Sequence, residues 1–200
     1  MAKIYELDGI RPAIDPTAFV HPDAIIIGDV IIGAGCYIAP GAALRGDFGR
    51  ITIKAGANVQ DNCAMHGFPG NETLIEEDGH IGHGAVIHGA VIGRNALVGM
   101  NAVVNDEAVI GAESIVAAMA FVKAGDVFPE RSLIVGIPAK RIRDVSDADI
   151  EWKAGGTRDY QELARRCHAS LKPTTPLSEP EPNRPYMPLG QSVPKHAKKP

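Results

Sequence analysis

The sequence has few aromatic residues, few cysteines and no long hydrophobic run. Only 5% of the 200 residues are Phe, Trp or Tyr, so the core must be built from aliphatic and small side chains. No apolar segment approaches the ~20 residues of a membrane helix, and the start, MAKIYELDGI, does not resemble a secretory signal. Three widely spaced cysteines favour reduced thiols over a disulfide framework, so we expect a cytoplasmic protein without a membrane segment.

The chain also lacks a charge excess of either sign. Its 20 basic and 24 acidic residues leave a net charge of −4, which gives no electrostatic footprint for nucleic acid and favours a small-molecule substrate. In contrast, Gly (22) and Pro (15) are abundant and indicate frequent turns. This combination of turns with an aliphatic core predicts a repetitive β architecture.

An aliphatic residue recurs every six residues through most of the chain, and a small residue usually follows four positions later. Neither an α-helix nor an ordinary strand gives this period. It predicts an all-β solenoid, a parallel β-helix of hexapeptide repeats with three short strands per coil and about six coils. Cys36 and Cys63 fall at the small inward position and are expected in the core. The expected large inward residues are Ile14, Val20, Ile26, Ile32, Ile38, Leu44, Ile53, Val59, Met65, Ile75, Ile81, Ile87, Ile92, Val98, Val104, Ile110, Val116 and Val122.

Breaks in the repeat define the expected organisation of the chain. A nine-residue step predicts a loop at 47–50, and a ten-residue step predicts a second loop within 67–72; functional residues often lie on such loops. The predicted segments are an N-terminal strand segment (1–13), the β-helix (14–140), a C-terminal helix (146–171) and a Pro-rich extended tail (172–200).

The C-terminal helix has a recognisable start and an expected interruption. Ser146 is the expected N-cap, and acidic residues follow it in the first turn. We expect a break near Gly155 and Gly156 and packing of the helix on the solenoid.

Counting strands places two histidines side by side. His66 and His88 both follow an inward residue and lie one coil apart, so their imidazoles should project from one outer face at the ~4.8 Å strand spacing. This separation suits joint ligation of one metal ion. Three histidines plus a water is the arrangement of an open catalytic zinc site, whose water has a pKa of about 7. His83, near a corner of the coil, would complete the site if a threefold trimer presented it to the next chain.

The alternative is that these histidines are polar residues on an exposed or subunit-contacting strand. Arg45 lies one coil below His66, and Asp61, with Gln60 beside it, lies one coil below His83. For Arg45 and Asp61 the alternative is a structural ion pair across a subunit contact. The remaining histidines show no partner in register and are expected to be solvated: His21, His80, His168 and His196.

These motifs resemble the γ-class carbonic anhydrase-like hexapeptide-repeat family. The matching runs include RGD at 45–47, NVQDNCAMHGFPG, EDGHIGHGA and IVGIPAKRIR, and they look like the branch of the phenylacetate-degradation protein PaaY and the carnitine-operon protein CaiE. The resemblance implies a left-handed β-helix and a homotrimer with a metal ion at each subunit interface. The ion would be zinc, or iron or cobalt, held by His66 and His88 of one chain and His83 of its neighbour.

The resemblance also implies roles for residues around the metal. Arg45 and Asp61 would pair between subunits, Gln60 would orient the metal-bound water, Asp47 would support the interface and Tyr160 would reach toward the site. A glutamate that follows the Arg-Gly-Asp run in γ-carbonic anhydrases is replaced here by Phe48. Phe48 cannot relay protons, and its presence therefore disfavours fast CO2 hydration. Its ring could instead form an apolar wall for an acyl group.

The resulting functional hypothesis is a metal-dependent thioesterase of the PaaY type. Metal-bound hydroxide would attack the thioester carbonyl of a ring-oxidised phenylacetyl-coenzyme A in phenylacetate catabolism. Three alternatives stay open: a γ-carbonic anhydrase that hydrates CO2 to bicarbonate, a hexapeptide acyltransferase with a histidine base and no metal, and a non-catalytic trimeric scaffold.

Overall fold

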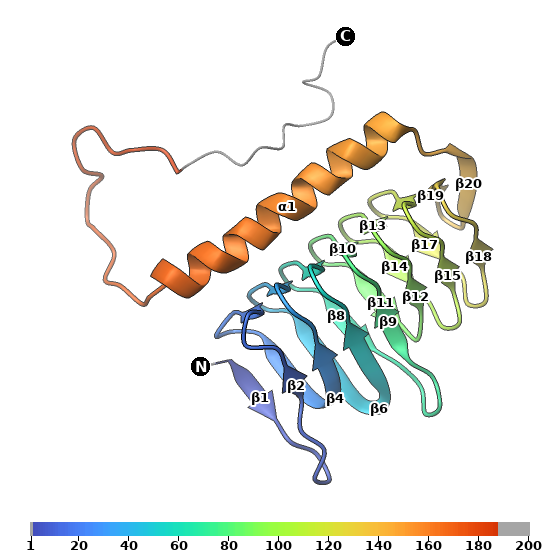
Figure 1. The fold of residues 1–200 in the computed structure, drawn as a ribbon, viewed down its shortest axis with the longest axis horizontal. Helices are drawn as coiled ribbons and strands as arrows, with labels where there is room; N and C mark the ends of the chain where they lie inside the picture. Colours follow the sequence, from blue (N-terminus) through green and yellow to red (C-terminus); the bar gives the residue numbers. More distant parts are fainter. Residues whose placement is uncertain (1, 188–200) are drawn as a thin grey trace.

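The six-residue repeat folds into short parallel strands that stack coil upon coil, with one long helix lying along the stack (Figure 1). The computed structural model describes residues 2–187. These residues form a left-handed β-solenoid of about seven turns, which confirms the predicted fold class. The structure has one turn more than the sequence count of six. The stack continues past Val122 through two further strands, because their aliphatic residues pair in register with the coil below.

One face of the solenoid is an eight-stranded sheet that lies beneath the helix. Seven of its strands are parallel, and the last strand folds back antiparallel and closes the end of the stack. In spatial order the strands are β3 (Phe19–Val20), β5 (Tyr37–Ile38), β7 (Asn58–Val59), β10 (His80–Ile81), β13 (Leu97–Val98), β16 (Ile115–Val116), β19 (Ser132–Gly136) and β20 (Ala139–Asp144).

The other two faces form one twelve-stranded sheet, because the long strand β6 (Ala43–Ile53) turns the corner between them. The first part of β6 pairs with β8, and its last three residues pair with β9. On the first of these faces the stack continues with β8 (Ala64–His66), β11 (Val86–His88), β14 (Val103–Val104) and β17 (Phe121–Val122). The second face continues with β9 (Thr73–Ile75), β12 (Val91–Ile92), β15 (Val109–Ile110) and β18 (Val127–Phe128). At the start of the sheet, β4 (Ile25–Ile32) pairs with β1 (Lys3–Tyr5), β2 (Ala13–Ile14) and β6.

The core consists of the residues that the repeat points inward. All the predicted large inward residues are buried, except that Ile14 and Val20 at the first coil are partly exposed. Cys36 and Cys63 are buried in this core, as expected. Burial raises the pKa of the Cys36 thiol to about 12 and that of Cys63 to about 11, so both stay protonated and unreactive at neutral pH.

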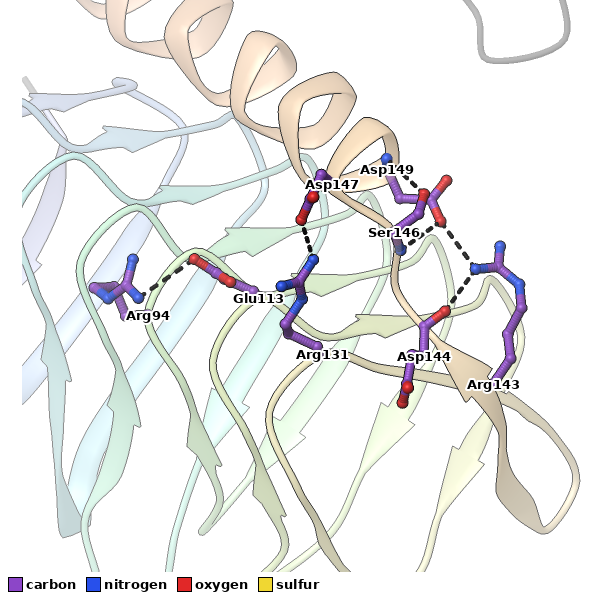
Figure 2. Close-up of polar contacts among 8 residues, drawn as sticks. All are labelled: Arg94, Glu113, Arg131, Arg143, Asp144, Ser146, Asp147 and Asp149. Atoms are coloured by element: carbon purple, nitrogen blue, oxygen red, sulfur yellow. Dashed lines mark hydrogen bonds and ion pairs between the residues drawn. The ribbon is translucent and has the colours of Figure 1, made fainter.

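Helix α1 (Asp147–Ser170) begins at the end of the solenoid that β20 closes. The Ser146 side chain accepts a hydrogen bond from the Asp149 backbone N–H at 3.2 Å, and the Asp149 carboxylate accepts one from the Ser146 N–H, which completes a capping box. Two arginines tie this first turn to the solenoid, since Arg143 pairs with Asp149 at 3.0 Å and Arg131 pairs with Asp147 (Figure 2). The start of the helix is therefore fixed to the last coils.

The helix runs without interruption through Gly155 and Gly156, where the sequence predicts a break. The two glycines face the solenoid rather than ending the helix: Gly155 is buried, and a Cβ on Gly156 would lie 3.8 Å from Cε1 of His80. The helix packs on the sheet, where α1 contacts β3, β5 and β7. No helix in residues 2–187 is long and apolar enough to cross a membrane. Residues 172–187 are exposed and contain neither helix nor strand, and the rest of the predicted tail, 188–200, lies outside the described residues.

Candidate metal centre

The ends of β8 and β11 bring two imidazoles together on the outside of the solenoid. The parallel register pairs His88 directly with His66, as the strand count predicts. The two ring centroids are 5.1 Å apart, and Nδ1 of His66 lies 3.1 Å from Nε2 of His88. The repeat therefore aligns both rings, and their side-chain conformations aim one nitrogen of each at the other.

Two carboxylates determine which nitrogen of each ring carries its proton. Nε2 of His66 lies 2.7 Å from the Asp47 carboxylate, and Nδ1 of His88 lies 2.6 Å from the Asp106 carboxylate. An ionised carboxylate only accepts hydrogen bonds, so these two nitrogens carry the N–H of the neutral rings. The nitrogens that face each other across 3.1 Å then both present lone pairs. Such an arrangement is stable only with a positive charge between them, either a proton or a metal ion.

The geometry of the pair fits a divalent metal ion. Zinc binds imidazole nitrogen at ~2.0–2.1 Å, so two such ligands lie ~2.9 Å apart at a right angle and ~3.4 Å apart at the tetrahedral angle. The observed 3.1 Å falls between these values. A carboxylate on the far nitrogen of each histidine is also typical of metal ligands, because it fixes the ring and makes it more basic. Within residues 2–187 of one chain, no three His, Cys, Asp or Glu side chains form a metal-binding group.

Aromatic rings flank the imidazole pair on both sides. Phe48 packs on His66 with ring centroids 5.4 Å apart, and Phe68 packs edge-on against His88 at 5.1 Å. Both Phe side chains are more than half exposed, so they form walls of a site that is open to solvent. The buried Thr73 hydroxyl donates to the His66 carbonyl at 2.7 Å, which ties the end of the Phe68 loop to the site.

The sequence predicts Phe48 as a wall of the site but does not predict Phe68 or Asp106 as parts of it. Phe68 follows His66 by two residues in the predicted loop, and this proximity was the available signal. Asp106 lies opposite Gly89 on the next coil, one position out of register with His88, so counting aligned positions alone could not select it.

His83 lies on the opposite edge of the same solenoid face, in the turn between β10 and β11. Its Nδ1 is 2.6 Å from the Asp61 carboxylate, and its side chain is 48% exposed. The Asp61 partner leaves the lone pair of the neutral ring on Nε2. Within one chain His83 does not join His66 and His88, so the idea that a neighbouring chain supplies it stays a prediction.

Arg45 lies beside the imidazole pair and contacts the same carboxylate. Its guanidinium donates to Asp47 at 2.6 Å, while the other oxygen of Asp47 faces His66. Asp47 thus joins Arg45 to the ligand pair within one chain. The expected pairing of Arg45 with Asp61 of a neighbouring chain stays a prediction.

Gln60 and Tyr160 lie at the His83 corner rather than beside His66 and His88. The Gln60 amide is 2% exposed and lies 2.6 Å from Nε2 of His80, and the Tyr160 ring packs edge-on against His80 at 5.4 Å. The expectation that His80 is solvated is wrong, because α1 covers it. Burial, together with the charges of Lys153 and His83, lowers the pKa of His80 to about 3, so the ring is neutral at pH 7.

The other histidines carry no site in the described residues. His21 accepts a hydrogen bond from the Asp23 backbone at 3.1 Å, and the His168 ring lies 3.1 Å from the Ala18 carbonyl, which anchors the end of α1. His196 lies outside the described residues.

Comparison with known proteins places the chain among hexapeptide-repeat proteins. Residues 13–46 and 89–124 match the bacterial transferase hexapeptide (six repeats) family model. The carnitine operon protein CaiE of Proteus sp. (strain LE138) is 57% identical over 185 residues, covering 92% of this chain and 94% of the relative. The protein of that name from Escherichia coli O157:H7 is 59% identical over 183 residues, covering 92% and 93%.

Two solved structures share the fold and an appreciable part of the sequence. A Bacillus cereus protein described as a candidate acetyltransferase superposes with a TM-score of 0.83 at 31% identity, covering 84% of this chain and 98% of its own. A hexapeptide transferase family protein from Anaplasma phagocytophilum gives a TM-score of 0.79 at 35% identity, covering 82% and 96%.

These comparisons correct the functional prediction. The hypothesis of a PaaY-type thioesterase in phenylacetate catabolism is wrong, because the curated relatives are named for the carnitine operon and the similar solved structures are described as transferases. The resemblance to the hexapeptide-repeat family and to CaiE is confirmed, whereas the comparisons do not show the PaaY branch. The motifs identify the family but not the substrate, because one repeat and one set of histidines can serve several reactions.

Proposed function

Because this chain belongs to the hexapeptide-repeat family of the carnitine operon proteins CaiE, we propose that it is a trimeric acyltransferase of carnitine metabolism with a metal ion at each subunit interface. The name of the relatives, carnitine operon protein CaiE, supports a role in carnitine metabolism. The descriptions of the two similar structures support transfer as the reaction class. The acyl donor in this proposal is a coenzyme A thioester.

The metal is supported above all by the two imidazole lone pairs that converge at 3.1 Å. A proton could also bridge them. However, both rings already hold carboxylate partners, and the site thus offers two neutral donors within a shell of negative charge from Asp47 and Asp106. This donor set suits zinc, with iron and cobalt as alternatives.

The third ligand is proposed to be His83 of a neighbouring chain. In one chain His83 lies at the other edge of the face that carries His66 and His88. When three such faces meet around a threefold axis, the leading edge of one face adjoins the trailing edge of the next. His83 is suited to this role because it is half exposed and because Asp61 orients its ring.

When bound, the metal would polarise the carbonyl oxygen of the acyl donor. The residues of this chain supply the rest of the site. Asp47 and Asp106 hold the imidazoles in one tautomer, Arg45 holds Asp47, and Phe48 and Phe68 provide apolar walls that limit water beside the reacting acyl group.

Metal binding and acyl transfer can be tested on the same preparation. We expect the Co2+-loaded protein to bind about one ion per chain, with the visible absorption of a nitrogen-coordinated ion, and His88→Ala to abolish it. His21→Ala, which removes a histidine far from the site, is the matched control. Acyl transfer is monitored by the consumption of acetyl-coenzyme A. We expect the coenzyme A thiol to be released only when carnitine is present as acceptor.

Four results would overturn the proposal in part or whole. A trimer that binds no metal removes the metal centre, and full acyl transfer by metal-free protein assigns the histidine pair to proton transfer instead. Thiol release that is independent of any acceptor, or CO2 hydration without acyl transfer, would remove the transferase assignment.

A further inference from the structure

A second concave site lies between α1 and the corner of the solenoid that carries His83. It is a groove of about 470 Å3, walled by Trp152 and Tyr160 of the helix on one side and by the turns that contain His83 and Met100 on the other. Gln60 and His80 lie along its floor. The groove is thus separate from the His66–His88 pair of its own chain, but His83 lies at its edge.

The helix wall of the groove has a glycine between its two aromatic residues, and we call the place of its missing side chain the notch. Trp152, Gly156 and Tyr160 are spaced four residues apart, so they lie on one face of α1; the two aromatic residues line the groove and Gly156 does not. A Cβ at Gly156 would meet nothing closer than Cε1 of His80, at 3.8 Å. The sequence thus places two aromatic side chains on either side of a space that a larger residue at 156 would fill.

The charge in and around the groove suits a cation that needs no hydrogen bonds. None of the described residues that line it is Asp, Glu, Lys or Arg, and most of its wall is aliphatic or aromatic. Lys153 of α1 does not line the groove, because it donates to the Asp78 carbonyl and to the Asn95 side chain at the opposite edge of the sheet. Its charge acts on His80, but burial lowers the pKa of Lys153 to about 7, which reduces the positive charge that it contributes at neutral pH. The Asp61 carboxylate lies behind His83 and supplies a negative charge at the groove edge.

We propose that this groove binds the trimethylammonium group of the substrate between Trp152 and Tyr160. The inference rests on the proposed role in carnitine metabolism and specifies its substrate class as a quaternary ammonium acid. Such a group is cationic, has an apolar surface of methyl groups and is recognised in proteins by the faces of Trp and Tyr. An ordinary ammonium group would instead need hydrogen-bond acceptors, which a largely apolar wall does not offer.

Trp152 provides a direct readout of occupancy, because it is the only tryptophan of the chain. The experiment titrates carnitine into the purified protein and follows both Trp152 fluorescence and the heat of binding. The comparison ligand is the neutral analogue in which a tert-butyl group replaces trimethylammonium, which keeps the shape and removes the charge. We expect a change in Trp152 emission and at least about 5-fold weaker binding of the neutral analogue.

Variants then assign the binding to the groove. Tyr160→Leu should weaken carnitine binding about 3- to 30-fold, and Gly156→Leu should block it by filling the notch. Tyr5→Leu is the matched control, because Tyr5 is an exposed tyrosine on β1, outside the groove, and it should bind carnitine normally. Circular dichroism confirms that each variant retains its helix.

The outcomes separate this inference from the proposed reaction. Equal affinity for carnitine and the neutral analogue would overturn it in favour of an acyl-chain site, and so would normal carnitine binding by both Tyr160→Leu and Gly156→Leu. Carnitine binding in the groove without acyl transfer would leave the inference intact and remove the acyltransferase. Acyl transfer to carnitine with a KM unchanged by Tyr160→Leu would support the acyltransferase and overturn the assignment of the groove.

Discussion

His80, which is partly buried beneath α1, makes the stability of the fold sensitive to acid. Its pKa is lowered from 6.5 to about 3, mainly by burial. Between these values the unfolded chain binds a proton that the folded chain excludes, so the contribution to stability is complete above pH 6.5 and is lost as the pH falls toward 3. At pH 4.5 the difference of ~2 pH units from the unfolded pKa corresponds to a loss of about 3 kcal/mol.

This loss can be measured by urea unfolding followed through Trp152 fluorescence, at a fixed protein concentration and at several values between pH 7 and pH 4.5. The reference is His80→Gln, which keeps a polar side chain beside Gln60 and cannot titrate. We expect the free-energy difference between wild type and variant to change by about 3 kcal/mol over this range. Other titrating groups affect both proteins alike and cancel in the difference.

A difference that stays constant with pH would show that His80 is not excluded from protonation and would refute the reasoning. If His80→Gln does not fold, NMR titration of the His80 ring in the wild-type protein gives the same decision. A ring that titrates near pH 6 contradicts the burial argument, and one that stays neutral at pH 4.5 supports it.

Three further predictions follow from α1 and the imidazole pair. Burial lowers the pKa of Lys153 from 10.5 to about 7, so the unfolded chain holds an extra proton between these values; stability should rise by about 3 kcal/mol from pH 7 to pH 9, and Lys153→Met should remove that rise in urea unfolding. Ser146→Ala removes the N-cap and should cost about 1 kcal/mol, against no change for the exposed Ser170→Ala. Asp106→Asn should weaken metal affinity by about 10- to 100-fold in Co2+ titrations, because it disturbs the orientation of His88.

The repeat made much of the fold predictable from the sequence. In a solenoid each coil pairs with the next, so an inward residue such as Ile87 determines where its neighbour His88 must lie. The same counting aligns His66 with His88 from the sequence alone, and the strand register confirms it. It succeeded because backbone pairing, rather than long-range packing, sets the position of these side chains.

The sequence was less informative wherever a side chain depends on another layer. His80 looked solvated because its partners, Gln60 and the helix α1, lie 20 or more residues away and contact it only in the folded chain. The sequence predicts a helix break near Gly155 and Gly156 because propensity describes an isolated helix, whereas packing of α1 on the solenoid keeps the helix continuous. The repeat and the register of the histidines do not predict the substrate, because aligned histidines indicate a type of chemistry but not a particular ligand.

His83 connects the two proposed sites. It lies at the edge of the groove beneath α1, and in the proposed trimer it also faces the imidazole pair of the next chain. A substrate held by its cationic end between Trp152 and Tyr160 would therefore extend toward the interface, where the acyl group is activated. This arrangement divides recognition and chemistry between the helix of one chain and the strands of another, so the monomer would keep its affinity for the quaternary ammonium and lose the reaction. We therefore expect a variant whose protomers are separated to retain carnitine binding and to lose acyl transfer. Each groove is complete within one chain, whereas the imidazole pair of one chain lacks a third metal ligand.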